Sequence, residues 1–257
     1  MSRRGASVSG LIMLFLWQLA SLALRTDVLP GPAAVGAAFL EQLPRGLGWH
    51  LVVSTDRILA AILLTIPTAA PLGIVIGQSR RWSRVLSPAI YITYPIPKVV
   101  LLPIVMLFLG IGDAAKVFLI WLVLFFQMLV VVKDAASAVR PELVQSVHSL
   151  GANRWQLLRY VYFPACTPAI LTSLRVTTGT AIAVLFISES FATASGLGYY
   201  IMVEAWGRMA YADMYAGVVA MSLLGLTLYL VLDRIERHAC QWLDPLAGPG
   251  AREEASE

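Results

Sequence analysis

The chain has 257 residues, of which 58% are hydrophobic and only 13% are charged, and its formal net charge is +4. A soluble globular chain carries about 25% charged residues, so this composition predicts a membrane protein with one domain of five or six spanning helices. The basic residues lie in short clusters at the ends of apolar runs rather than in a broad patch with stacking aromatics, which excludes nucleic-acid binding.

The residue types that carry most enzyme chemistry are scarce and scattered. Cys166 and Cys240 are the only cysteines and form no Cys-x-x-Cys spacing, so neither a disulfide framework nor a zinc site is predicted. His50, His148 and His238 lie on different segments without ligand or triad spacing. The sequence has no Gly-x-x-x-x-Gly-Lys-Ser/Thr loop for binding ATP phosphates. We therefore predict a protein that is not an enzyme and holds no metal.

Six apolar segments are predicted to be spanning helices, which need about 20 residues each. In chain order they are Val8–Leu24, Leu51–Gly77, Leu86–Gly110, Val117–Val132, Ala165–Ile187 and Met214–Leu232. The first follows two arginines without a clear small-x-small cleavage site, so it is predicted to be a retained anchor. Together they predict an all-α membrane domain over residues 1–243. Residues 244–257 are rich in Gly, Pro, Ala and Glu and are predicted to be a disordered cytoplasmic tail.

The positions of the basic residues predict the orientation of these spans. With the N-terminus in the cytoplasm, the inner segments hold twelve of the 19 Lys and Arg residues: Arg3, Arg4, Arg80, Arg81, Arg84, Lys133, Arg140, Arg154, Arg159, Arg234, Arg237 and Arg252. The outer segments keep only Arg25, Arg45, Lys116 and Arg208. The positive-inside rule therefore predicts that both termini are cytoplasmic, together with the loop that joins the fourth and fifth spans.

Prolines and charged residues interrupt the apolar segments. Pro95 and Pro97 remove backbone donors and are expected to kink or break the third span, either beside a polar pathway or as plain packing features. Lys98, Arg175 and the pair Asp56-Arg57 are costly within a bilayer and are expected to face the bundle interior or an aqueous path. One interpretation is that Lys98 or Arg175 attracts an anion. The alternative is that these residues snorkel or form internal pairs, such as a pair between Arg175 and Glu189. Gly179, Ala181 and Ala183 suit close helix packing.

The loop over residues 140–164 has a helical pattern of its own. Pro141 suits a first helical position, and Glu142 complements the positive end of a helix. Apolar residues recur at roughly helical spacing up to Gly151, and a second amphipathic piece, Arg154–Phe163, leads to Pro164 and the fifth span. The pattern predicts two short helices joined at a glycine and lying along the membrane surface. An interfacial hairpin that merely joins two spans fits the composition as well.

The spacing of this loop resembles the signature loop of the permeases of binding-protein-dependent ABC importers. That family has a Glu-Ala-Ala triplet, a Gly four residues after it, and an Ile-x-Leu-Pro that begins ten residues after the Gly. Here the triplet reads Gln145-Ser146-Val147, the glycine is Gly151, and the last element is Val161-Tyr162-Phe163-Pro164. The glycine and the proline match, whereas the triplet departs from the family. The charged contact to the ATPase that the family's Glu would make is therefore absent or is supplied by Glu142.

The resemblance extends from about residue 49 to residue 237. Over that range the sequence is similar to permeases for sulfonates, taurine and nitrate. Pro95-Ile96-Pro97-Lys98 with Phe108-Leu109-Gly110-Ile111-Gly112 looks like the third-span pattern of that subfamily. Leu174-Arg175, Gly179, Glu189 and Gly196-Leu197-Gly198 look like its fifth span and the following loop.

The resemblance implies a type I ABC importer permease fold with six spans and a coupling-helix loop at 140–164. It implies a bacterial inner-membrane protein without a cofactor, which works with two ATPase subunits that bind ATP and Mg, a second permease copy, and a periplasmic or lipid-anchored binding protein. The residues implied in ATPase contact are Glu142, Gln145, Ser146, Val147, Gly151, Arg154, Trp155 and Pro164. The residues expected along the pathway are Pro95, Pro97, Lys98, Arg175 and Glu189.

Other functions remain to be weighed against this one. An ion-coupled secondary transporter would show repeated halves and coupling-ion residues near the midplane, and no repeat stands out. Gly110-Ile111-Gly112-Asp113 matches the Gly-x-Gly-Asp string of intramembrane aspartyl proteases, but no second interior Asp is well placed to share a proton with Asp113. The expected cargo is a small anion such as a sulfonate, taurine or nitrate, with a thiamine-precursor pyrimidine as the alternative.

Overall fold

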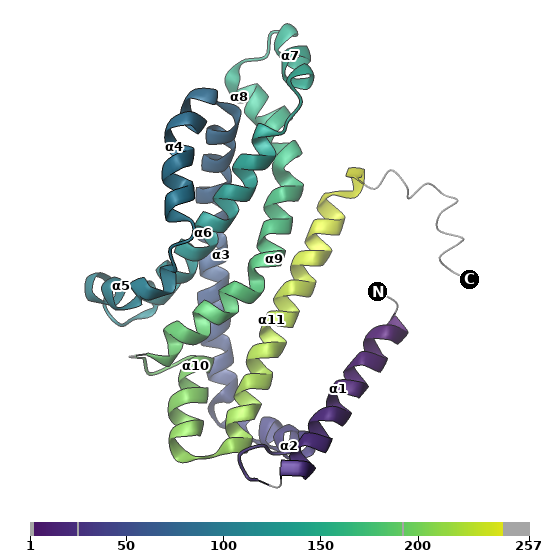
Figure 1. Ribbon diagram of the computed structural model, residues 1–257, viewed down its shortest axis with the longest axis vertical. Helices are drawn as coiled ribbons and strands as arrows, with labels where there is room; N and C mark the ends of the chain where they lie inside the picture. Colours follow the sequence, from purple (N-terminus) through teal and green to yellow (C-terminus); the bar gives the residue numbers. More distant parts are fainter. Residues whose placement is uncertain (1–2, 25, 192, 244–257) are drawn as a thin grey trace. The chain divides into compact units, whose positions relative to one another are not determined.

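The computed structural model describes residues 3–24, 26–191 and 193–243, and these contain no β-strand. In chain order, the helices are α1 (Arg3–Leu24), α2 (Pro32–Gln42), α3 (Gly48–Gln78), α4 (Arg80–Thr93), α5 (Leu102–Leu109), α6 (Asp113–Ser137), α7 (Pro141–Ser149), α8 (Arg154–Leu157), α9 (Phe163–Ser190), α10 (Leu197–Tyr199) and α11 (Tyr211–Ala239) (Figure 1). Shorter 3-10 and π turns are η1 (Leu43–Leu47), η2 (Lys98–Leu101), η3 (Leu158–Tyr162), η4 (Tyr200–Ala205), η5 (Trp206–Arg208) and η6 (Gln241–Leu243). The predicted tail, 244–257, lies outside the described residues.

Four helical stretches are long and apolar enough to cross a membrane, namely Pro32–Gln78, Asp113–Ser137, Arg154–Ser190 and Tyr211–Ala239. They contain the predicted second, fourth, fifth and sixth spans, which are confirmed as apolar helices. The predicted third span consists of two helices, α4 and η2–α5, which make a fifth span if the pair is counted as one. The apolar part of α1, Val8–Leu24, is shorter than these stretches, so the count of six spans stays a prediction.

The chain divides into two compact units, and several helices contribute to both. Unit 1 comprises Met1–Leu59, Val99–Leu119 and Ile182–Leu226, and unit 2 comprises Ala60–Lys98, Ile120–Ala181 and Thr227–Glu257. In unit 1, Trp17 Nε1 donates a hydrogen bond to the carbonyl of Pro30 (3.1 Å), which ties α1 to the segment that follows it. Gly217 on α11 allows close packing, because a Cβ there would lie 2.6 Å from the side chain of Ile201.

In unit 2, α4 packs beside the second part of α3 and against α6 (Figure 1). Ile76, Ile90 and Leu129, one from each of these three helices, form a buried apolar cluster. Helices α3 and α6 approach so closely at Gly77 that a Cβ there would lie 2.7 Å from the Cβ of Ala136. Burial of branched side chains and close contact at small residues therefore hold this unit together.

The predicted break at Pro95 and Pro97 is confirmed, because α4 ends at Thr93 and residues 94–97 are not helical. Pro97 has no N–H to donate to the carbonyl of Thr93, as a continuing helix would require. The ammonium of Lys98 replaces the missing donors, binding the carbonyl oxygens of Thr93 (2.7 Å) and of Tyr94. The helix end thus has a side-chain cap supplied from the residue that follows the break.

Candidate functional site

The loop at 140–164 has a helix on each side of a turn at Gly151, as its pattern predicts. Helix α7 begins with Pro141 in its first turn and has Glu142 there, next to the positive end of the helix dipole. Gly151 has φ +85°, a conformation that favours glycine, and its N–H donates to the carbonyl of His148 (2.9 Å). In Figure 1 this hairpin lies at one end of unit 2, where α6 ends and α9 begins.

A reciprocal capping box starts the second helix of the hairpin. The side chain of Asn153 accepts a hydrogen bond from the N–H of Gln156 (2.9 Å), and the Gln156 side chain accepts one from the N–H of Asn153 (2.7 Å). Both bonds satisfy backbone donors that a helix start leaves free. The local sequence Asn-x-x-Gln therefore defines where α8 begins.

The second helix does not end before Pro164, so the predicted separate piece Arg154–Phe163 is wrong in this respect. α8 continues through the π turn η3 into α9, and Arg154–Ser190 is one helical stretch of 37 residues. In a regular α-helix Pro164 would clash with the carbonyl of Tyr160. Tyr160 lies in the wider π turn, which is a common way for a helix to absorb such a conflict.

The hairpin exposes large apolar side chains. No residue of α7 is buried, and Leu150 and Trp155 are 85% and 66% exposed. Among the other residues predicted to contact an ATPase, Val147 is half-buried and the following are exposed: Glu142, Gln145, Ser146, Gly151, Arg154 and Pro164. The predicted contact residues therefore share one accessible hairpin.

A second site, inside unit 1, is a buried network around the carboxylate of Glu189 near the end of α9. This carboxylate accepts hydrogen bonds from Nη1 of Arg57 (2.7 Å), from Oγ of Ser54 (2.8 and 2.9 Å) and from the N–H of Gly198 (3.1 Å). Glu189 has no exposed surface and Arg57 is 3% exposed. A buried charge of this kind is tolerable only when it is paired and hydrogen-bonded, and both conditions hold here.

The Gly196-Leu197-Gly198 segment is built around this network. Gly196 has φ +109°, and a Cβ there would lie 2.5 Å from Oε1 of Glu189 and 2.6 Å from Nη1 of Arg57. A Cβ on Gly198 would lie 2.6 Å from the carbonyl oxygen of Phe186. Both glycines are therefore required by close approach to α9, and the first also by its backbone conformation.

Two residues of the same face of α3 fix the backbone of this segment. His50 Nδ1 accepts the N–H of Gly196 (3.0 Å), and Ser54 Oγ accepts the N–H of Leu197 (2.8 Å). Because Nδ1 is an acceptor, the imidazole proton lies on Nε2, which is 3.4 Å from Oε1 of Glu204. The start of α3 thus holds the end of the loop that follows α9, at the point where α10 begins.

Two further ionic groups complete the network. Arg57 also donates to Oδ1 of Asp113 (2.5 and 2.8 Å) and to the carbonyl of Ser195 (2.9 Å). Lys116, buried one turn after Asp113, donates from Nζ to the carbonyls of Ile111 (2.8 Å) and Gly112 (3.3 Å). The network therefore joins α3, the start of α6, the end of α9 and the loop beyond it.

Two of the predicted pathway residues have internal partners of a different kind. Arg175 forms ion pairs in unit 2 with Asp233 (2.7 Å) and Glu236 (3.2 Å) of α11, so its predicted pairing with Glu189 is wrong. Both Arg175 and Glu189 belong to α9, and the fourteen helical steps from one to the other correspond to about 21 Å. Lys98 caps α4, and Pro95 and Pro97 form the break before it.

Sequence reasoning found parts of the buried network but not its connections. Arg57 was expected to face the interior and does so, whereas the same expectation for Asp56 is wrong because Asp56 is exposed. Glu189 was expected only along the pathway or as a partner of Arg175. His50, Ser54 and Lys116 were missed. The signal for the first two is their spacing, because His50, Ser54 and Arg57 recur at four and three residues and so share one face of a helix.

One more buried group of unit 1 lies beside this site. Tyr200 is buried, and its hydroxyl has no hydrogen-bond partner among the described residues. Burial, and next the nearby carboxylates of Asp213 and Glu204, raise the pKa of Tyr200 to about 12. The phenol therefore stays neutral at physiological pH.

Comparison with known proteins gives a consistent result. Residues 69–243 match the family described as "Binding-protein-dependent transport system inner membrane component". The chain is 31% identical to the taurine transport system permease protein TauC of Escherichia coli, over 88% of this chain and 84% of that protein. It is 30% identical to the riboflavin transport system permease protein RibX of Chloroflexus aurantiacus, over 93% and 90%.

The fold is also similar to that of a solved transporter. A chain of the inward-facing MetNI methionine ABC transporter aligns with a TM-score of 0.59 at 21% identity, covering 77% of this chain and 95% of that one. The putative aliphatic sulfonates transport permease protein SsuC of Bacillus subtilis is 26% identical over 92% of this chain and 87% of its own length. The family match covers more than half of the chain, and the chain therefore belongs to the inner-membrane permease components of binding-protein-dependent ABC transporters.

Proposed function

We propose that this chain is the membrane subunit of an ATP-driven importer, and that the hairpin at 140–164 carries the motion of a separate ATPase into the spans. The observation that carries the proposal is the exposure of α7 and of the turn after it, since the apolar residues Leu150, in that turn, and Trp155, in α8, lie on the surface. A helix of nine residues is marginal in water on its own, so contact with a partner would stabilise it. Trp155 and Arg154 are residue types that dominate binding energy at interfaces.

The proposed assembly has two permease chains and two ATPase subunits. Each chain has one such hairpin, so two ATPases need two copies, and six spans per chain with both termini in the cytoplasm suit this arrangement. The ATPase subunits would bind ATP and Mg, and this chain would hold no cofactor. A periplasmic or lipid-anchored binding protein would deliver the cargo to the outer face, including the segment Ser195–Tyr211.

The proposed cargo is a small anion of the sulfonate or taurine type. The support is the naming of relatives for taurine and for aliphatic sulfonates, although a relative named for riboflavin has nearly the same identity. Since relatives with similar sequences are named for different cargos, the choice of cargo would depend mainly on the binding protein. Titration of the binding protein that works with this chain with taurine, aliphatic sulfonates, nitrate and riboflavin is the direct test, and nanomolar to micromolar affinity for riboflavin alone would contradict the proposal.

The coupling role is tested with Gly151→Asp. A Cβ at Gly151 meets nothing within 4 Å in this chain, so the cost comes from φ +85° and from a charge placed at the partner surface. We expect normal membrane insertion, loss of ATP-dependent uptake and at least tenfold less ATPase in the purified complex. Gly110→Asp is the matched control for ATPase retention, because Gly110 also has positive φ (+76°) and open space for a Cβ.

Two results would contradict the proposal. One is full uptake and ATPase retention in Gly151→Asp. The other is uptake by the wild-type chain that needs an ion gradient but no ATP, which would indicate the secondary transporter.

A further inference from the structure

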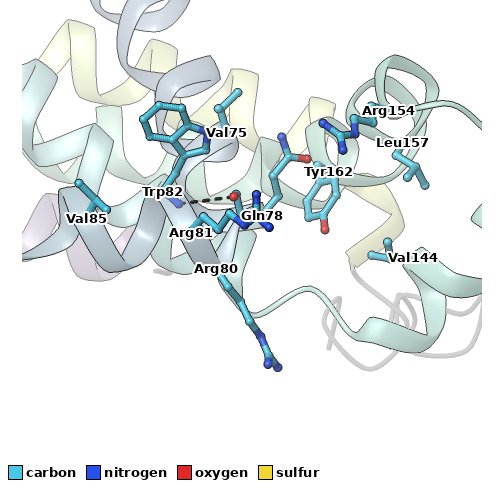
Figure 2. Close-up of a pocket in the computed structure, with 11 residues that line it drawn as sticks. Val75, Gln78, Arg80, Arg81, Trp82, Val85, Val144, Arg154, Leu157 and Tyr162 are labelled. Atoms are coloured by element: carbon cyan, nitrogen blue, oxygen red, sulfur yellow. Dashed lines mark hydrogen bonds between the residues drawn. The ribbon is translucent and has the colours of Figure 1, made fainter.

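An open cleft of about 890 Å³ lies in unit 2 beside the start of α4, α7 and α8. Figure 2 shows Gln78, Arg81 and Tyr162 gathered near its middle, with Arg154 and Leu157 on the α8 side. Figure 2 also shows Arg80 pointing away from this group. The cleft is distinct from the Glu189 network, all of whose residues belong to unit 1.

The cleft has an excess of positive charge. Arg80, Arg81 and Arg154 line it, and none of the described lining residues is an Asp or a Glu. None of these three arginines forms an ion pair with any residue that the structure describes, whereas Arg57, Arg175 and Arg237 all do. Uncompensated guanidinium groups around a concave surface attract anions, and their planar donors match phosphate oxygens in particular.

One wall of the cleft is apolar and exposed. Trp82 and Val85 of α4 are 56% and 68% exposed, and Val75 of α3 is also exposed. An inorganic anion or a soluble phosphate gains nothing from such a wall. A lipid does, because its phosphate and its acyl chains need a basic and an apolar surface side by side.

The cleft also lies where the spanning helices end. The stretch Pro32–Gln78 ends at Gln78, α4 begins at Arg80, and the stretch Arg154–Ser190 begins at Arg154. Those three residues all line the cleft. Basic pockets at the ends of spanning helices, with Trp and Tyr at the same level, are the usual place for lipid headgroups.

We propose that this cleft binds an anionic phospholipid, with Arg81 and Arg154 as ligands of its phosphate and Trp82 and Val85 against its acyl chains. The proposal needs only that the chain spans a membrane. It shares Arg154 with the proposed ATPase contact, so Arg81 is the ligand whose replacement separates the two roles. An acidic surface of a protein partner is the competing occupant, and the test below separates the two.

The experiment uses the purified full-length chain and native mass spectrometry with added phosphatidylglycerol or phosphatidylcholine. We expect the wild type to retain phosphatidylglycerol preferentially, and Arg81→Gln and Arg154→Gln each to weaken its binding by about tenfold. Arg84→Gln is the matched control, because Arg84 is an exposed arginine of the same helix that does not line the cleft. Its lipid binding should equal that of the wild type.

A second measurement needs no variant. A photoactivatable phosphatidylglycerol should cross-link wild-type peptides that contain residues 75–85 and 154–162, and excess glycerol 3-phosphate should not displace it. The proposal is overturned if Arg81→Gln and Arg84→Gln bind lipid equally, or if excess glycerol 3-phosphate displaces the lipid. It is also overturned if Arg81→Gln, purified together with its ATPase, loses the ATPase while keeping its lipid.

Discussion

Gly196→Ala should be among the most damaging single-methyl additions in this chain. The new Cβ would lie 2.5 Å from Oε1 of Glu189 and 2.6 Å from Nη1 of Arg57, and closer still to the carboxyl carbon. Neither group is the free end of a mobile side chain. The Glu189 carboxylate is held by Arg57, Ser54 and the N–H of Gly198, so it cannot move aside without breaking a buried bond.

Two costs add for this substitution. An alanine at φ +109° costs roughly 1–2 kcal/mol in backbone strain, and separating a buried ion pair costs about 3–5 kcal/mol. Native proteins have on the order of 5–15 kcal/mol of stability, so the total is a large share of it. The loop can escape part of this cost by detaching locally, in which case its backbone donors to His50 and Ser54 are lost instead.

The assay follows thermal unfolding with a thiol-reactive fluorophore in a Cys240→Ser background, so that the fully buried Cys166 reports unfolding. We expect Gly196→Ala to lower the midpoint by about 10 °C or more, from a typical 2–4 °C per kcal/mol. Gly207→Ala is the control, because Gly207 is exposed and a Cβ there meets nothing within 4 Å.

A midpoint within 2 °C of that control would refute the reasoning. The cause can be checked further by adding Glu189→Ala, which removes the carboxylate that the new methyl group meets. If the clash is real, Gly196→Ala should cost less in the Glu189→Ala background than alone, and strict additivity would mean that the two residues do not interact.

Three further predictions concern other parts of the chain. Gly77→Ala should lower the thermal midpoint by several degrees, because a Cβ there overlaps the backbone of α6 at Lys133. Gly179→Ala is the control and should leave the midpoint unchanged or raise it slightly, because Gly179 is helical and has open space around its Cβ position. Lys98→Met should destabilise the fold by roughly 1–3 kcal/mol, because two carbonyls at the end of α4 lose their donor; unchanged thermal unfolding would show that water supplies the bonds equally well. Tyr200→Phe should be neutral or stabilising at pH 7, since it removes a buried hydroxyl without a partner. Because the folded-state pKa of Tyr200 is raised from 10.0 to about 12, the wild type should lose stability between pH 10 and pH 12 relative to Tyr200→Phe, and parallel pH profiles would contradict this.

Hydropathy and local turn chemistry account for the features that the sequence predicts correctly. The four long apolar helices follow from runs of residues that exceed the membrane length, and the break after Thr93 follows from Pro95 and Pro97. The hairpin turn follows from Gly151 and from the capping residues beside it. Each of these depends on neighbours within a few positions in the chain.

The connections of the buried network could not be predicted in the same way. Arg57 and Glu189 are 132 residues apart, and a single sequence shows that each needs a partner without showing which one. The expected pairing of Arg175 with Glu189 ignored that one continuous helix would contain both. Two charged residues that are close in sequence can still be too far apart to pair when one long helix contains both of them.

The two glycine turns show how one local signal can have two physical origins. Gly151 and Gly196 both have positive φ, a backbone conformation that favours glycine. A Cβ on Gly196 collides with the Arg57–Glu189 pair of its own chain, whereas a Cβ on Gly151 meets nothing within 4 Å. Contacts within this chain are therefore enough to explain why position 196 requires glycine. At 151 the chain itself requires only the backbone conformation, and any further intolerance to side chains measured there must come from a surface that another molecule provides.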